Sequence, residues 1–251
     1  GNHTFTIDAQ REPMAISSMV FKTVAEVPSY ADYIATHEAN GAKNVSADAA
    51  TKIQAETPIL TSNKTIYQLN DRASVLSEPQ DVSTTVLNEI GGDKWQYVGQ
   101  WIEWEFTAPE SGFYYIVPRS IQDYYSGVYV SRKVLIDGVQ PFEEAGYCRF
   151  NNSDNWVVEP LNCGKDVNGD GKIDSGDSLK FYIEKGTHIL RMEVVLGDMA
   201  SILSEISESL VKVNAYYRKI LMVTGPSPDT YRDYGFERSM PDVIRGLKAQ
   251  S

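Results

Sequence analysis

Residues 99–117 read GQWIEWEFTAPESGFYYIV. Apolar and charged residues alternate over positions 101–106, which is the period-two pattern of a strand with one buried face. Residues 107–112, TAPESG, form a turn, and an aromatic run follows at 113–117. We therefore predict two strands paired as a hairpin, with Ile102, Trp104 and Phe106 in the core.

Similar short runs recur along the chain. Residues 128–136 alternate and stop at Asp137-Gly138, a pair that favours a tight turn. The runs 179–184 and 188–196 flank a turn and are predicted to form another hairpin. Strands at this density favour a mainly β fold, a jelly-roll type of two-sheet sandwich over residues 46–197.

A long helix is predicted after the sandwich. Apolar residues recur there at intervals of three and four, at Leu203, Ile206, Leu210, Val213, Tyr217 and Ile220. Asp198 is the expected N-cap and Gly225 the expected end. We expect this apolar stripe to pack on the sandwich or on a further helix of a longer protein.

The two ends of the chain are predicted to be helical in part. Residues 1–45 read as an N-terminal extension with a short helix at 29–39, because Tyr and Ile recur there at helical spacing. Residues 198–251 read as a helical segment that becomes helical again from about Pro241 and leads into a further part of a longer protein.

The composition and charge of the chain limit the classes of function that we expect. The 251 residues carry 23 Lys and Arg against 34 Asp and Glu, a net charge of −11. Nucleic-acid surfaces need clustered basic side chains, so we expect no nucleic-acid partner. No apolar run approaches the roughly 18 residues of a membrane span. Cys148 and Cys163 are predicted either as a disulfide, in an oxidising compartment, or as two buried free thiols.

The strongest local motif is DVNGDGKIDSGD at residues 166–177. It matches a calcium-binding loop, with oxygen-bearing side chains at positions 1, 3, 5, 9 and 12, Gly at position 6 and a backbone carbonyl at position 7. The predicted Ca²⁺ ligands are Asp166, Asn168, Asp170, Lys172 (carbonyl), Asp174 and Asp177. A strand follows the loop, so we expect one structural site and no calcium switch. The alternative is a polar turn without a metal.

Two aromatic loops predict a sugar site. Flat rings can cover the C–H faces of a sugar while amide and carboxylate groups bind its hydroxyls. The predicted stacking residues are Tyr124, Tyr125 and Trp156, and the predicted hydroxyl partners are Gln122, Asp123 and Asn155. The alternative is that these rings belong to the core.

Catalysis has less support in the sequence. Glu103 and Glu105 would share a strand face about 7 Å apart, as the carboxylates of inverting glycosidases do, but alternating charge is also the ordinary solvent face of a strand. The three His residues are scattered and no nucleophile motif occurs. We therefore predict no enzyme, with a glycoside hydrolase as a minor alternative.

Segments 99–120, 130–145 and 181–200 resemble the core strands of carbohydrate-binding modules of families 6 and 35. The chain over residues 28–251 resembles more closely a β-sandwich module in extracellular solute-binding lipoproteins of Gram-positive ABC sugar transporters. The resemblance implies a non-catalytic, cell-surface module that binds an oligosaccharide or polysaccharide. Its other partners would be the rest of the parent solute-binding protein and the ABC permease.

The resemblance also bears on a second metal site. In those families a Glu of an early strand helps to bind a structural Ca²⁺, and Glu56 in IQAE stands at the matching position. The other functional class left open is a structural or docking sandwich without a ligand of its own.

Overall fold

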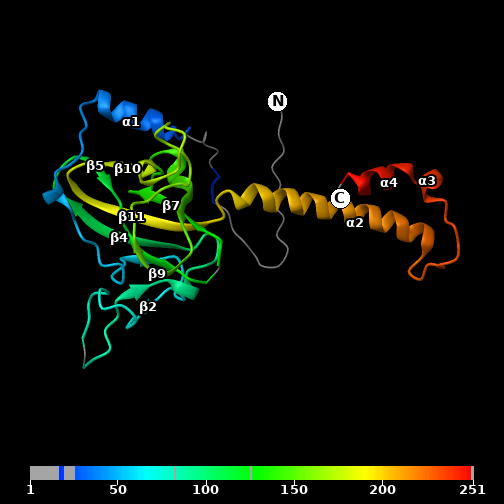
Figure 1. Cartoon of the computed structure of the whole chain (residues 1–251), viewed down its shortest axis with the longest axis horizontal. Coiled ribbons are helices and arrows are strands. Elements are labelled where there is room, and N and C mark those ends of the chain that lie inside the picture. The colour runs from blue at the N-terminus through cyan, green and yellow to red at the C-terminus, as the bar shows by residue number, and fades with distance from the viewer. Residues whose placement is uncertain (1–16, 20–25, 82, 125, 250–251) are drawn as a thin grey trace.

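The computed structural model describes residues 17–19, 26–81, 83–124 and 126–249. It is mainly β, as predicted, and its principal sheet has five antiparallel strands in the order β1-β4-β11-β7-β8 (Figure 1). These strands are β1 (Leu60–Thr61), β4 (Trp101–Ala108), β7 (Val130–Ile136), β8 (Cys148–Phe150) and β11 (Gly186–Val195).

The remaining strands form antiparallel pairs. Strand β5 (Gly112–Tyr115) pairs with β10 (Lys180–Ile183) and provides the facing layer of the sandwich. The other two pairs are β2 (Gln68–Leu69) with β3 (Glu89–Ile90), and β6 (Arg119–Gln122) with β9 (Ser153–Val158). Short 3₁₀ turns lie between these elements at η1 (Ala47–Ala49), η2 (Gly92–Lys94), η3 (Glu143–Tyr147) and η4 (Ser175–Asp177).

The two predicted hairpins are wrong, although their strands are present. Strand β4 pairs with β1 and β11, and β11 pairs with β4 and β7, so both edges of each strand are occupied within the five-stranded sheet. Strands β5 and β10 therefore pair with each other in the opposite layer. The turns after β4 and after β10 carry the chain from one layer to the other, which is the connection expected of a jelly-roll type of sandwich.

One core lies between the layers. Ile102 is fully buried, Trp104 is almost fully buried and Phe106 packs against the cluster, so the predicted core face of β4 is confirmed. The facing side chains include Phe113 of β5 and Phe181 of β10. The core also contains Cys148 and Cys163, which the structure holds as two free thiols.

Helix α1 (Tyr30–Ala39) is confirmed, with Ser29 as its N-cap. Its Tyr30 and Tyr33 are buried in the same core, and their hydroxyls accept hydrogen bonds from the backbone N–H groups of Lys180 (3.0 Å) and Tyr182 (2.8 Å). These N–H groups lie on the edge of β10 that β5 does not cover. The helix therefore closes that edge, and the predicted boundary at residue 45 does not separate α1 from the sandwich.

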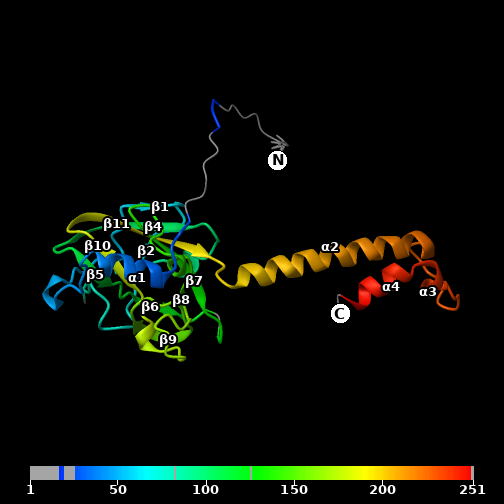
Figure 2. The same ribbon diagram turned by 90° about the horizontal axis from the view of Figure 1, so that it is seen from above.

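Helix α2 (Met199–Thr224) begins where β11 ends and extends away from the sandwich, and both views show this plainly (Figures 1 and 2). Its 26 residues end at Thr224, and Gly225 is the C-cap at the predicted end. The side chain of Asp198 makes no N-cap bond; its carboxylate instead forms an ion pair with Arg149 of β8. That pair joins the start of the helix to the sheet.

Two short helices follow α2. Helix α3 (Phe236–Ser239) leads into α4 (Pro241–Lys248), which folds back along the C-terminal half of α2 (Figure 2). Val243 is the buried residue of α4, and Gly246 lies against the Tyr216 ring, where a Cβ atom would stand 2.2 Å from Cζ. A side chain at position 246 would therefore displace the Tyr216 ring from this contact.

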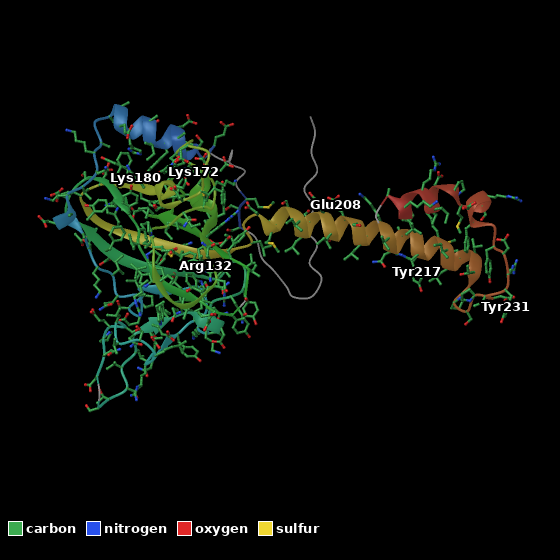
Figure 3. All side chains as sticks on the ribbon, in the orientation of Figure 1. Arg132, Lys172, Lys180, Glu208, Tyr217 and Tyr231 are labelled. Carbon is green, nitrogen blue, oxygen red and sulfur yellow. The ribbon has the colours of Figure 1, made fainter. Side chains whose placement is uncertain are left out.

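The predicted apolar stripe does not pack on the sandwich. Leu203, Ile206, Leu210 and Tyr217 are 44–57% exposed, and Figure 3 shows Tyr217 on the part of α2 far from the β domain. Within the described part of the chain, no helix has both the length and the apolar character that a membrane span needs.

Candidate functional site

The predicted sugar loops meet at one end of the β6–β9 ribbon. Gln122 lies opposite Ser153 in the register, and the ladder shifts between Ser120 and Gln122. The Asn152 amide donates to the Gln122 carbonyl at 2.8 Å and to its side-chain oxygen at 3.3 Å. The structure therefore brings the loop after β6 and the turn before β9 together, although they are about thirty residues apart in the chain.

Trp156 is hydrogen-bonded to a separate loop of the chain. Its indole N–H donates to Asp71 at 3.0 Å, and the Arg119 guanidinium lies over its ring at 4.4 Å. Partial burial raises the pKa of Asp71, but the hydrogen bonds from Ser77, the Ala73 N–H and Trp156 outweigh this effect and hold it below its usual value. One face of the predicted stacking ring is therefore covered by Arg119.

The other predicted sugar contacts are more exposed. Tyr124 is 71% exposed, and Asp123 and Asn155 are also exposed. Burial, with the nearby charges of Asp71 and Asp123, raises the pKa of Glu89. Tyr125 lies outside the described residues.

A polar cleft opens beside this junction. Its volume is about 280 Å³, close to the lower end of the range for small-molecule sites. It is lined by Pro118, Ser120, Arg149, Phe150, Asn151, Asn152, Ser153, Val157, Glu159, Pro160, Leu161 and Asn162. Amide and hydroxyl groups thus face the cleft beside a few apolar walls, which is a lining that suits a hydroxylated ligand.

None of the predicted sugar contacts that the structure describes lines this cleft. The cleft combines three segments that become neighbours only through the pairing of β6 with β9 and of Arg149 with Asn162. The adjacent amides Asn151 and Asn152 were the available signal.

The loop 166–177 is organised by its own carboxylates. Asp166 accepts the N–H groups of Gly169 (2.6 Å) and Gly171 (2.7 Å), one on each carboxylate oxygen. Asn168 accepts the Asp170 N–H at 2.9 Å, and Asp170 accepts the Lys172 N–H at 2.8 Å. The predicted ligand side chains therefore accept local backbone N–H groups, and each of these oxygens retains a lone pair.

Asp177, at the end of the loop, is hydrogen-bonded to residues at its start. It is 1% exposed and accepts the N–H groups of Asp174 (2.9 Å), Val167 (2.8 Å) and Asn168 (3.2 Å). These bonds, the one from Asp174 first, lower the pKa of Asp177. Asp174 accepts the Gly176 N–H at 2.7 Å and completes a capping box with Asp177.

The predicted metal ligands do not form a ready-made site in the described residues. Among the described residues, no group of three or more His, Cys, Asp or Glu side chains is already arranged to hold a metal ion. The loop's carboxylates would therefore have to converge on binding. Figure 3 labels Lys172 in this loop and Lys180 on the strand that follows. Glu56 is buried, and the described structure shows neither a hydrogen bond nor an ion pair for its carboxylate.

The carboxylates of β4 are not arranged as an acid and a base. Glu103 is buried and paired with Arg191, whose Nε lies 2.7 Å from Oε1, and the Arg191 guanidinium stacks on Trp101 at 4.1 Å. Glu105 is exposed. Glu103 therefore does not lie on an open solvent face as the alternation predicts; its cross-strand partner covers it.

Comparisons with known proteins add little to this geometry. No protein-family model and no curated protein matches the chain. Among solved structures, the chain is similar to a cycloisomaltooligosaccharide glucanotransferase of Paenibacillus sp. in complex with cycloisomaltoheptaose, with 20% identity and a TM-score of 0.39. The match covers 66% of this chain and only 21% of that one. The mainly β class of the fold rests on the strand pairing described above.

Proposed function

We propose that this chain is a non-catalytic carbohydrate-binding module. The observation that carries the proposal is the polar cleft beside the β6–β9 ribbon, where the side chains of Asn151, Asn152 and Asn162 lie beside the apolar walls of Phe150 and Pro160. Amides bind sugar hydroxyls, and apolar walls accept the C–H faces. Tyr124, exposed on the adjoining loop, supplies a ring for stacking. A shallow site of this kind should bind with a Kd of about 10⁻⁵ to 10⁻³ M.

The test is calorimetric titration with a panel of oligosaccharides and polysaccharides. Asn151→Ala should weaken binding about five- to tenfold, the effect of one hydrogen bond, and Tyr124→Ala by a similar factor. The Asn151 side chain is exposed, so its removal should not affect folding. Asn214→Ala and Tyr231→Ala, both on the exposed helical segment, are matched controls without an effect. Absence of any binder at millimolar sugar would reject the proposal.

We propose in addition that loop 166–177 binds one structural Ca²⁺. The donor set fits a hard cation, because four carboxylates, one amide and a carbonyl lie within twelve residues. The ion would neutralise their mutual repulsion and fix the connection into β10. Glu56, a buried carboxylate without a described partner, is the candidate ligand of a second site.

Calcium titration tests this with a charge variant. Asp170→Asn keeps an acceptor for the Lys172 N–H but removes a charge, so it should weaken Ca²⁺ binding at least tenfold. Asp154→Asn, an exposed aspartate outside the loop, is the control. At a hundredfold excess over Kd, Ca²⁺ should stabilise the protein by about 2.7 kcal/mol, or roughly 5–10 °C in Tm. An unchanged Tm at millimolar Ca²⁺ and constant ionic strength would exclude the site.

The resemblance to solute-binding lipoproteins supports a wider proposal about location. We propose that the module acts outside the cell as part of a sugar-uptake protein, with the remainder of that protein and the ABC permease as partners. Labelling of intact cells with an antibody to the sandwich tests this, because an intracellular module would remain unlabelled until the cells are opened.

A second candidate function is favoured by the exposed stripe of α2. Leu203, Ile206, Leu210 and Tyr217 would dock on the remainder of the parent protein, and the sandwich would be a spacer without a ligand. Leu203→Gln with Leu210→Gln should then leave the sandwich stable but increase the protease sensitivity of α2 in the full-length parent. Unchanged protease sensitivity would count against docking.

A further inference from the structure

The two cysteines occupy opposite positions on paired segments. Arg149 of β8 forms an antiparallel bridge with Asn162, and its N–H donates to the Asn162 carbonyl at 2.8 Å. In antiparallel pairing, one step back on one segment meets one step forward on the other, so Cys148 stands opposite Cys163. Side chains at opposite positions lie on the same face of a sheet.

Burial shows that this face is the one that points into the core. Cys148 and Cys163 are both fully buried, as is Leu161 at 2% exposure, whereas Arg149 and Asn162 between them are partly exposed. The alternation is that of two strands with the cysteines pointing inward. Both thiols belong to the single core cluster of the sandwich.

The spacing of opposite positions suits a covalent bond. Directly opposite Cα atoms in antiparallel strands are about 4.5 Å or about 5.5 Å apart, depending on whether the pair is hydrogen-bonded. Both values fall within the roughly 4.4–6.8 Å that disulfides span. The chain contains two cysteines in all, so neither has a competing intramolecular partner.

We propose that Cys148 and Cys163 form a disulfide when the protein folds in an oxidising medium. The oxidant is a small-molecule disulfide such as oxidised glutathione. One cysteine thiolate attacks its S–S bond and releases one reduced thiol, and the second cysteine then displaces the other. Two cysteine thiols lose two protons and two electrons, and the oxidant is reduced to two thiols.

The bond should form before the core closes. Burial, together with the neighbouring Cys163, raises the pKa of the Cys148 thiol, and burial likewise raises that of Cys163. Because thiolates are the reactive form, the thiols of the folded, reduced protein should react slowly. Once formed, the bond would fix the segment that enters the loop 166–177 to β8.

Trypsin provides a direct test on the intact chain. Cleavage after Lys133, Arg149 and Lys165 places the two cysteines in separate peptides, 134–149 and 150–165. After refolding with oxidised and reduced glutathione and alkylation in denaturant, the two peptides should be recovered as one linked species. Recovery of both peptides singly alkylated would overturn the proposal.

Stability gives an independent readout. A disulfide closing this loop of 15 residues should raise Tm by roughly 6–12 °C over the reduced protein. Cys148→Ala with Cys163→Ala should have the same Tm with and without oxidant. If that variant does not fold, the peptide test on the unmodified chain still decides. An oxidised protein no more stable than the reduced one would contradict a native, unstrained bond.

Discussion

At the residue scale, His188 is the side chain whose charge is most clearly controlled by its neighbours. Its Nδ1 lies 2.7 Å from the Asp137 carboxylate and its Nε2 lies 2.8 Å from the Glu184 carbonyl. Partial burial lowers the pKa of His188, but these two partners outweigh it and raise the value above the usual one. Asp137 is itself held by the turn after β7, where its φ of 51° is followed by Gly138 at 77°.

The raised pKa of His188 predicts a pH-dependent stabilisation. The folded state holds the proton more tightly than the unfolded state, so the contribution is complete below about pH 6.5 and is lost as the pH rises through the folded-state value. His188→Gln should lower stability by about 0.5 kcal/mol at pH 5.5 and have less effect at pH 8.5, since the pair is partly exposed. Denaturant unfolding at both pH values measures this.

His37 provides the contrasting case for the same experiment. Burial lowers its pKa, and its ring stacks on Tyr182 at 4.2 Å. Its contribution should therefore weaken as the pH falls, and His37→Gln should be most costly at pH 8.5. Equal pH profiles for the two variants would contradict both assignments.

At the scale of elements, the contact between α1 and β10 depends on two hydroxyl groups. Burial raises the pKa of Tyr33 to about 12, so its hydroxyl remains protonated and neutral while it accepts the Tyr182 N–H. Tyr33→Phe would keep the packing but leave that partly buried N–H without this partner. We expect a loss of about 1–3 kcal/mol in the free energy of unfolding, measured by chemical denaturation.

Tyr114→Phe is the matched control. The Tyr114 hydroxyl donates to the Glu110 carbonyl at 2.7 Å in an exposed turn, where water can replace it. Its loss should cost less than about 0.5 kcal/mol. If Tyr33→Phe were no more costly than this control, the edge of β10 would not depend on α1.

At the scale of the whole molecule, stability is divided between two parts. The core cluster of the sandwich contains no residue of α2 or α4, and the buried residue of α4, Val243, packs separately against α2. Val243→Asp should release α4 because it places a charge in that contact. Hydrogen exchange over 241–248 should increase strongly while the Tm of the sandwich remains unchanged.

Asp242→Ala, at an exposed position of the same helix, should leave both parts unaffected, because its ion pair with Arg245 is solvent-accessible. A lower sandwich Tm in Val243→Asp would show instead that the helical hairpin and the β domain unfold together.

Local rules were enough to locate most elements from the sequence. Alternation located β4 and β7, and Gly225 and the Asp137-Gly138 turn were recognised because helix ends and tight turns involve only neighbouring residues. The bonds accepted by Asp166 and Asp170 in loop 166–177 are of the same kind, since each of these acceptors contacts an N–H a few residues away.

Strand partners and the cleft were decided only by the tertiary structure. A strand's alternation records which face is buried but not which edge is free, so 101–106 and 113–117 appeared to be a hairpin although β1 and β11 occupy both edges of β4. The buried ion pair of Glu103, the cover of Trp156 by Arg119 and the opposed cysteines have the same origin. Each joins residues that are distant in the chain, and such contacts depend on sheet order, which short-range patterns do not encode.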